Sequence, residues 1–309
     1  MKTLIIATLI FLDIIPHGAP FVSEMQRDLE SRIKVEEKTT SNVASQNNPQ
    51  LIDFSPLPNK KAEFYTPGVG ANNYLAVDVG TSEIMLEKGK NEAVEVASLT
   101  KLMTARLLLK DGNLAKTVTV NDLSKMRADD SRANLVAGDE ISYRDLLKAL
   151  LINSAADAAL TITNNLYPGG YNEFIAKMNA EALVLGLKNT NFDNPVGWDS
   201  PKNYSSAQDL QILTRTLLQN EEFKKVVSTP STSFTSEKGY IYPLKNTNIL
   251  LDGTTVFGIK TGHTTSAGDC LIALIKVKNS DVLFVILGAG DRFYEARNLL
   301  TWTNLVYNW

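Results

Sequence analysis

Residues 96–110 decide the fold of this chain, and they read VASLTKLMTARLLLK. From Ser98 onward this stretch has strong helix formers, no Gly or Pro, and apolar residues on most faces, as in a helix buried in a core. Ser98 and Lys101 are three residues apart, so they project from the same side of that helix. The pair is either a serine nucleophile with a lysine base or an N-cap serine beside a lysine whose amine reaches solvent. Taken alone, the pair is better explained by the second alternative.

The composition sets the class of protein. With 309 residues, 44% of them hydrophobic, the chain can bury one large core or two. The net charge is −3 and no long basic run occurs, so we expect no nucleic-acid partner. The one cysteine, Cys270, lies in an apolar run and is expected to be a small buried hydrophobe. Two histidines are too few for a His-rich metal site, and a Ser-His-Asp triad would depend on His263.

The first 65 residues differ in composition from the rest. Residues 1–20 start with Met1-Lys2 and an apolar segment of signal-peptide length, which predicts an export signal or an N-terminal anchor. The segment is too short to span a membrane comfortably, and a buried strand or helix is the alternative. Residues 21–65 are polar and predict a linker.

The remaining chain has strand patterns at both ends and helical patterns between them. The expected strands are residues 73–79, 83–87, 256–260, 269–277 and 282–287. The expected helices include residues 144–160, 171–185, 207–218 and 294–307. This order predicts an α+β fold: an antiparallel sheet built from both chain ends, flanked by helices, with an inserted helical lobe at about 111–220. A site is expected in the cleft between lobe and sheet.

Two further motifs accompany the Ser98 helix. Ser154 lies among small residues, in Ser-Ala-Ala, and residues 260–263 read Lys-Thr-Gly-His at the expected end of a strand. In such a motif Lys260 supplies a cation for a carboxylate, Thr261 supplies a hydroxyl donor, and Gly262 lets a substrate backbone approach the strand. Taken alone, Lys260 is better explained as an ordinary edge-strand lysine.

In this order the three motifs resemble those of penicillin-binding proteins and serine β-lactamases. The resemblance covers about residues 70 to 305 and is most specific for the D-alanyl-D-alanine carboxypeptidases among the low-molecular-weight penicillin-binding proteins. The segments that carry it are residues 78–105, 135–147, 174–187 and 246–264. It implies that residues 66–309 form a serine carboxypeptidase domain with a β-lactamase/transpeptidase-like fold and no metal or cofactor.

The resemblance also implies the acylation chemistry. Ser98 attacks the carbonyl of the penultimate D-alanine in a peptidoglycan stem peptide, Lys101 removes its proton, and Ser154 relays protons with Lys101. A lysine base has to lose about 3 pKa units from its usual value near 10.4, which costs about 4 kcal/mol. Burial between two lobes and a second cation, Lys260, both act in that direction.

The Lys-Thr-Gly motif is expected to bind the substrate. By the resemblance, Lys260 and Thr261 hold its terminal carboxylate, and the backbone N–H groups of Ser98 and His263 form the oxyanion hole. The ring of His263 is expected at the edge of the cleft, and a role for that ring as the base is the less favoured alternative.

One position departs from the family pattern. The second motif of the family is Ser-x-Asn, and its third position here is Ala156. The asparagine of this motif is expected to hydrogen-bond to the substrate and to the lysine base. Losing such a hydrogen bond costs about 1–3 kcal/mol, which corresponds to about ten- to a hundredfold in rate. Asn153 is not expected to replace the missing asparagine, because residues 153 and 156 lie at different angles from Ser154 around a helix. We therefore expect a slow peptidase, and a relative that binds without efficient turnover is the alternative.

Three other expectations follow from the resemblance. The expected partners are peptidoglycan stem peptides, and β-lactams are the expected covalent inhibitors. The expected location is the outer face of the bacterial cytoplasmic membrane, periplasmic or extracellular. Peripheral association with that membrane is left open. A D-alanyl endopeptidase and a β-lactamase remain alternatives, although the Glu-x-x-Leu-Asn string of class A β-lactamases does not occur. Many family members continue into a β-rich domain and an amphipathic anchor helix. Here the sequence ends after one helix, whose aromatic side chains are expected to cover the sheet.

Overall fold

A computed structural model of the chain describes residues 57–61, 66–121 and 123–309. All of these belong to one compact unit, Ser55–Trp309. The predicted export signal at 1–20 and most of the predicted linker at 21–65 lie outside the described residues. None of the helices in the described part of the chain is long and apolar enough to cross a bilayer.

The centre of the unit is a five-stranded antiparallel sheet with the strand order β3-β2-β10-β9-β8. The register places Phe284 opposite both Ala76 and Ala273, so β10 pairs with strands from both ends of the chain. The predicted α+β fold class is thereby confirmed. The strand bounds are β2 Ala71–Asp78, β3 Ile84–Lys88, β8 Lys260–Thr264, β9 Gly268–Val277 and β10 Ser280–Ala289.

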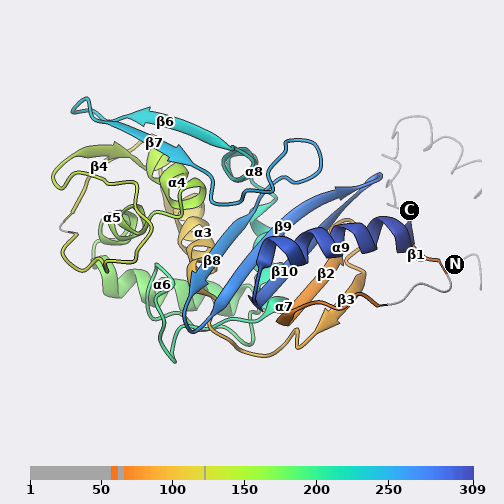
Figure 1. Cartoon of the computed structure of the whole chain (residues 1–309). Coiled ribbons are helices and arrows are strands. Elements are labelled where there is room, and N and C mark those ends of the chain that lie inside the picture. The colour runs from red at the N-terminus through yellow and green to blue at the C-terminus, as the bar shows by residue number, and fades with distance from the viewer. Residues whose placement is uncertain (1–56, 62–65, 122) are drawn as a thin grey trace, which may run out of the picture. The chain divides into compact units, whose positions relative to one another are not determined.

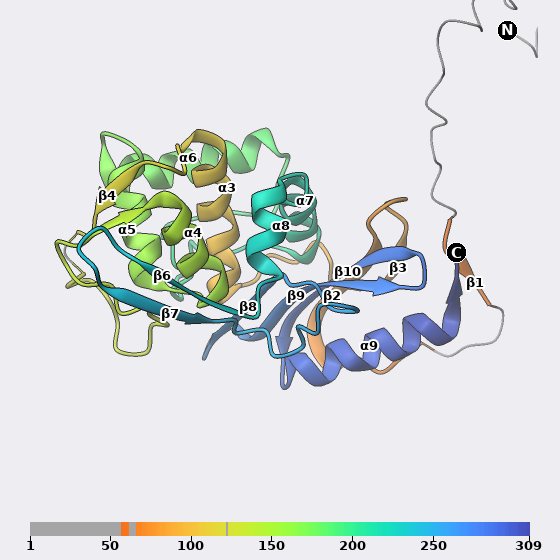
Figure 2. The same ribbon diagram turned by 90° about the horizontal axis from the view of Figure 1, so that it is seen from above.

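Both faces of this sheet are buried. Successive residues of a strand point to opposite faces, and along β10 Leu283 and Val285 join one core while Phe284 and Ile286 join the other. Helix α9 (Arg292–Val306) covers one face, and the helical block covers the other (Figure 2). The prediction that aromatic side chains of this helix cover the sheet is confirmed at Trp302, which is buried in the core between α9 and the sheet.

The helical block is organised around α3 (Lys101–Asp111), which contacts four of the other helices (Figure 1). Capping side chains define where two helices begin, because Ser142 accepts from the N–H of residue 145 and Ser206 accepts from that of residue 209. The other helices are α4 Tyr143–Ile152, α5 Ala156–Leu166, α6 Gly170–Val184, α7 Ala207–Leu217 and α8 Glu221–Val227.

The predicted helix at 144–160 is wrong in its middle. Helix α4 ends at Ile152, and α5 begins only at Ala156. Between them Ser154 has φ +58°, and the Ala155 N–H donates to the Ala149 carbonyl at 3.1 Å, which closes the end of α4. No Gly or Pro marks this break, so the sequence pattern of apolar residues runs through it. The break places the Ser154 side chain on a tight turn.

The predicted strand at 256–260 is also wrong. Strand β8 begins at Lys260, and Val256 makes only an isolated bridge to Ile275. Lys-Thr-Gly therefore starts a strand and does not end one. The structure adds three short strand pairs: β1 Asn59–Lys60 with β11 Tyr307–Asn308, β4 Thr117–Thr119 with β5 Glu140–Ser142, and β6 Ser231–Thr235 with β7 Ile241–Lys245.

Candidate active site

Ser98 lies on a short 3-10 turn, η1 (Ala97–Thr100), that leads directly into α3. This turn packs against β8. Two glycines make the close approach possible. A Cβ added to Gly197 would lie 1.9 Å from the Ala97 carbonyl oxygen, and one added to Gly262 would lie 3.1 Å from the Ser98 nitrogen. The backbone N–H of Ser98 is therefore fixed between a loop and a strand edge.

Lys101 is the first residue of α3 and reaches Ser98, as the three-residue spacing predicts. Its Nζ lies 2.8 Å from Ser98 Oγ and 2.7 Å from the carbonyl oxygen of Val196. The Lys101 side chain is buried at 1% exposure, whereas Ser98 is partly exposed. The amine thus sits behind the hydroxyl, on the side away from solvent.

Burial changes the charge state of this amine. Loss of water lowers the pKa of Lys101 from 10.5 to about 7, although the nearby carboxylates of Asp130 and Asp157 act in the opposite direction. A substantial fraction of the amine is therefore neutral at pH 7. A neutral amine 2.8 Å from a hydroxyl can accept its proton.

Lys260 is buried as well, and it contacts the third motif residue. Its Nζ lies 2.7 Å from Ser154 Oγ and 2.9 Å from the Thr261 carbonyl oxygen. Burial, and then the positive charges of Lys101 and Arg292, hold the pKa of Lys260 well below its usual value. Ser154 is thus hydrogen-bonded to Lys260, whereas the hydrogen bonds of Lys101 go to Ser98 and Val196.

The other residues of the Lys-Thr-Gly-His motif lie along β8. Thr261 Oγ1 is 2.6 Å from Thr247 Oγ1, and Gly262 adjoins the nucleophile turn. The side chain of His263 is 63% exposed, and its Nδ1 lies 2.7 Å from Asp269 Oδ1. The imidazole is therefore at the edge of the site, paired with an aspartate of β9.

The profile of the D-alanyl-D-alanine carboxypeptidase family matches residues 60–291. This chain belongs to that family. The D-alanyl-D-alanine carboxypeptidase DacF of Bacillus subtilis is 33% identical over 228 residues, which are 71% of this chain and 58% of the relative. The D-alanyl-D-alanine endopeptidase of Pseudomonas aeruginosa is 34% identical over 248 residues, which are 76% of this chain and 77% of the relative.

The fold of the family is shared with solved structures. The Streptomyces K15 DD-transpeptidase matches with a TM-score of 0.73 and 28% identity, covering 78% of this chain and 99% of that one. The chain spans just over half of the length of the Bacillus relative, 58%. The family and the fold predicted from the three motifs are confirmed.

Sequence reasoning missed one backbone contributor to the family site. The Val196 carbonyl holds Lys101, and its loop is fixed by Asn194, whose Oδ1 accepts from the N–H groups of residues 196, 197 and 198. The Thr104 hydroxyl of α3 also donates to the Pro195 carbonyl at 2.8 Å. The string Asn-Pro-Val-Gly is a turn signal, but any residue type can offer a carbonyl, so nothing in the sequence connects this loop to Lys101.

A second missed feature is an ion pair behind β8. Arg292 Nη1 donates to the Gly262 carbonyl at 2.8 Å and to Asp269 Oδ1 at 3.0 Å. Asp269 in turn contacts His263. The first residue of α9 is thereby attached to the strand that carries Lys-Thr-Gly.

Ala156, which replaces the family's asparagine, is buried at the start of α5. Its N–H donates to the Ser131 carbonyl at 2.8 Å. The neighbouring carboxylate of Asp157 accepts from the N–H groups of Ala133 and Leu135 at 3.1 and 3.0 Å. The start of α5 therefore holds the loop that crosses beside Ser154.

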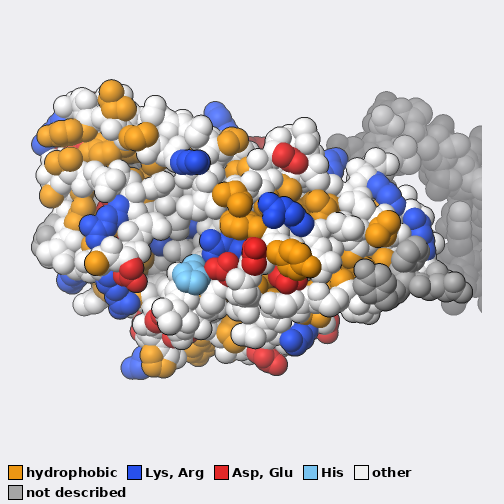
Figure 3. Space-filling view, viewed as in Figure 1, with side chains coloured by type: hydrophobic (Ala, Val, Ile, Leu, Met, Phe, Trp, Pro, Cys, Tyr) orange, Lys and Arg blue, Asp and Glu red, His pale blue; other side chains and the backbone are white. Residues whose placement is uncertain are grey.

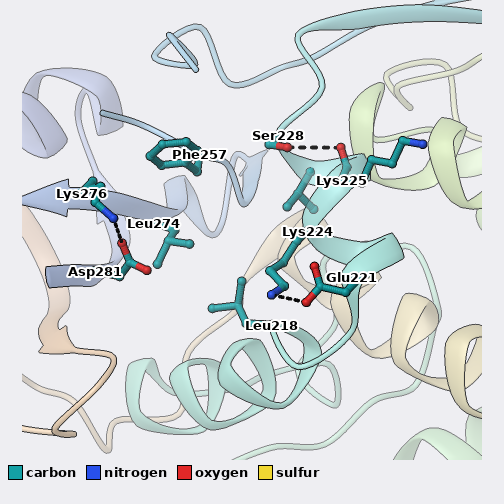
Figure 4. Close-up of a pocket in the computed structure, with 10 residues that line it drawn as sticks. Leu218, Glu221, Lys224, Lys225, Ser228, Phe257, Leu274, Lys276 and Asp281 are labelled. Carbon is teal, nitrogen blue, oxygen red and sulfur yellow. Dashed lines mark hydrogen bonds and ion pairs between the residues drawn. The ribbon is translucent and has the colours of Figure 1, made fainter. Parts of the chain in front are cut away.

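A cavity of about 400 Å³ lies apart from these residues, between α8 and strands β9 and β10 (Figure 4). Four of its charged side chains form two ion pairs, Lys224 with Glu221 and Lys276 with Asp281, and Lys225 also lines it. The apolar side chains of Leu274 and Leu218 lie between the two pairs, and Phe257 also lines the cavity. It shares no lining residue with the Ser98 site.

Proposed function

We propose that this protein is a serine D-alanyl-D-alanine carboxypeptidase that removes the terminal D-alanine from peptidoglycan stem peptides. The observation that carries the proposal is the contact between Ser98 and Lys101. A partly exposed hydroxyl lies 2.8 Å from a buried amine whose pKa is about 7. This is the arrangement that an activated serine nucleophile requires.

In the proposed acylation step, Ser98 Oγ bonds to the carbonyl carbon of the penultimate D-alanine and its proton passes to Lys101. The N–H groups of Ser98 and His263 stabilise the oxyanion. When the peptide C–N bond breaks, the leaving D-alanine nitrogen takes the proton. Water then hydrolyses the Ser98 ester, again with Lys101 as base, and returns the free enzyme.

The buried polar residues around this pair serve the same reaction. Ser154 carries protons between Lys101 and the leaving nitrogen, and Lys260 orients the Ser154 hydroxyl through their 2.7 Å contact. Thr261 and Lys260 attract the terminal carboxylate of the substrate, with Gly262 leaving room for its backbone. The amine of Lys260 and the hydroxyl of Thr261 are the hydrogen-bond donors that a carboxylate accepts.

The turnover that we propose is slow, because Ala156 cannot supply the amide of Ser-x-Asn. The alternative is a relative that is acylated and binds peptidoglycan with little turnover. A D-alanyl endopeptidase is the second candidate activity, because the Pseudomonas endopeptidase is as similar to this chain as the carboxypeptidases are. Fast hydrolysis of penicillin would instead identify a β-lactamase.

The proposed place of action is the cell wall, periplasmic or extracellular, at the outer face of the cytoplasmic membrane. Membership of a cell-wall peptidase family supports this location. The proposed ligands are stem peptides and, as covalent inhibitors, β-lactams.

The test is the release of free D-alanine from a peptide that ends in D-Ala-D-Ala, together with labelling by a fluorescent penicillin. The wild-type chain should do both, Ser98→Ala should do neither, and Ser231→Ala, which alters an exposed serine of β6, should behave as wild type. Labelling without D-alanine release would favour the binding relative. A Ser98→Ala variant that still releases D-alanine would refute the assignment.

A further inference from the structure

Two loops meet beside the buried base, one at residues 126–132 and one at residues 194–200. The first lies between β4 and β5, and the second carries the Val196 carbonyl that accepts from Lys101. On the face of the molecule seen in Figure 3, acidic and basic side chains lie close together over the first loop, to the left in the view. Most of this loop is solvent-exposed, whereas Asp130 is half-buried.

The carboxylate of Asp130 joins the two loops. Its Oδ1 accepts from the indole Nε1–H of Trp198 at 2.7 Å, and its Oδ2 accepts from the backbone N–H of Arg127 at 2.7 Å. The guanidinium carbon of Arg127 lies over the Trp198 ring, 4.8 Å from the ring centre. The indole is therefore held at its N–H by a charged acceptor and on one face by a cation–π contact.

Trp198 belongs to the same turn as the carbonyl that accepts from the base. Asn194 Oδ1 accepts from the N–H groups of Val196 and Trp198 at 3.2 and 3.0 Å, and Asn194 Nδ2 donates to the Trp198 carbonyl at 3.1 Å. The Val196 carbonyl oxygen lies 2.7 Å from Lys101 Nζ. A displacement of Trp198 would therefore move the hydrogen-bond acceptor of the amine.

The residue after Asp130 is attached to the other side of the base. The Ser131 carbonyl accepts from the N–H of Ala156 at 2.8 Å, and Ala156 begins α5 two residues after Ser154. Residues 130 and 131 therefore contact both the loop that holds Lys101 and the position at which the family has its asparagine.

The orientation of the Lys101 amine explains why these contacts bear on the chemistry. A protonated lysine has three N–H donors, and the neutral amine keeps two donors and gains a lone pair. This lone pair can take the Ser98 proton only if it points at the hydroxyl. Because the Val196 carbonyl accepts one N–H, it restricts the rotation of the amine. The family's asparagine would add a second acceptor, and Ala156 adds none.

We propose that Asp130 and Trp198 are positioning residues for the base and that they replace, in part, the asparagine missing at position 156. The inference rests on the proposed function, in which Lys101 takes the proton of Ser98. The pair fixes the carbonyl that orients the amine, but it offers no amide to the substrate. The change Ala156→Asn therefore still has a contact to restore.

Asp130 also has an electrostatic effect that a merely structural residue lacks. Burial lowers the pKa of Lys101, and the carboxylates of Asp130 and Asp157 raise it. Two further cations lie nearby, because the charges of Lys101 and Lys260 repel each other and Arg127 contacts Asp130. Removing the negative charge at position 130 should therefore lower the pKa of the amine further.

The experiment measures the rate of acylation by a fluorescent penicillin and the release of D-alanine in the full-length enzyme. Trp198→Phe removes the indole N–H and keeps an aromatic ring, and Asp130→Ala removes the acceptor. The matched control is Trp309→Phe, because the Trp309 indole also donates to a carboxylate, Asp78 Oδ2, at 2.6 Å. That contact lies at the C-terminal end of the chain, away from α3 (Figure 1). The thermal midpoint of unfolding verifies that each variant is folded.

Trp198→Phe and Asp130→Ala should each lower the acylation rate about tenfold, the effect of one lost hydrogen bond to a charged group, and Trp309→Phe should not change it. Because both changes break the same hydrogen bond, the double variant should be about as slow as either single variant. Ala156→Asn should increase the rate of Trp198→Phe by a larger factor than it increases that of wild type.

Asp130→Asn separates position from charge, and it decides the question if Trp198→Phe does not fold. It keeps one acceptor oxygen for the indole and loses the charge, so the midpoint of the pH profile of kcat/KM should move below that of wild type. Wild-type rates in folded Trp198→Phe and Asp130→Ala, or an unmoved midpoint in Asp130→Asn, would overturn the assignment. A wild-type enzyme that penicillin acylates but that releases no D-alanine would overturn the proposed function alone, because the acylation rates still test the two positioning residues.

Discussion

Lys101 loses contact with water on all sides, and its pKa falls to about 7 as a result. If the neutral amine is the base, the fraction of enzyme molecules that carry it increases as the pH rises through that pKa. The rate constant kcat/KM for D-alanine release should therefore rise about tenfold per pH unit below pH 7 and level off above it. The measurement is a profile from about pH 5 to 9, with penicillin acylation as a second substrate that should give the same midpoint. A rate that is still rising tenfold per unit at pH 9 would contradict a pKa near 7 for the buried amine, and a rate independent of pH would mean that Lys101 is not the base.

Ala156 offers a second prediction at the scale of one residue. The change Ala156→Asn restores the amide that the family motif places beside the base, and it should raise the acylation rate by about tenfold or more. Because position 156 is buried, the larger side chain also needs room, so the thermal midpoint of unfolding is measured in parallel. Stopped-flow acylation by penicillin gives the rate. An unchanged rate in a folded variant would mean that another group already fills this role.

At the scale of elements, the loop around Gly197 decides whether the nucleophile turn keeps its position. Gly197 has φ +94°, and an added Cβ would collide with the Ala97 carbonyl oxygen. The variant Gly197→Ala should therefore lose at least about 2 kcal/mol of unfolding free energy and most of its acylation rate. Gly290→Ala is the matched control, because an added Cβ there meets no atom within 4 Å. Equal stability of the two variants in urea would contradict this account of the turn.

The elements also show what sequence can and cannot predict. The contact between Ser98 and Lys101 was predictable because a helical turn brings residues three apart together. The turn at Ser154 was not, because no Gly or Pro interrupts the helical pattern there. The hydrogen bond from Lys101 to Val196 joins residues far apart in the chain through a backbone atom, and side-chain patterns carry no information about such a contact.

At the scale of the molecule, the sheet explains why motifs far apart in sequence form one site. Strand β10 pairs with β2 near the start of the domain and with β9, and β9 pairs with β8. Because η1 packs on β8, this order places the nucleophile against Lys-Thr-Gly. The pattern of strands predicted the fold class, whereas the strand order came only with the structure.

Burying the lysine base lowers the free energy of unfolding of the whole fold, and the size of this loss depends on pH. The pKa of Lys101 is about 7 in the folded protein and 10.5 for an exposed lysine, so between these values the unfolded chain binds more protons. Stability therefore rises with pH in that window, and the penalty is fully present at and below pH 7. The variant Lys101→Met removes the penalty and should unfold at higher denaturant concentration than wild type at pH 7, while losing all activity.

The difference in unfolding free energy between Lys101→Met and wild type should then shrink by roughly 2 kcal/mol between about pH 7 and pH 9. In this range the folded amine is mostly neutral, and binding of a proton stabilises the unfolded wild-type chain less and less as the pH approaches 10.5. Urea unfolding at several pH values measures this difference directly. Lys188→Met, at an exposed position, controls for the substitution itself. A difference in unfolding free energy between wild type and Lys101→Met that stays constant across this range would mean that the amine is protonated in the folded enzyme. The lysine-base mechanism would then lose its physical basis.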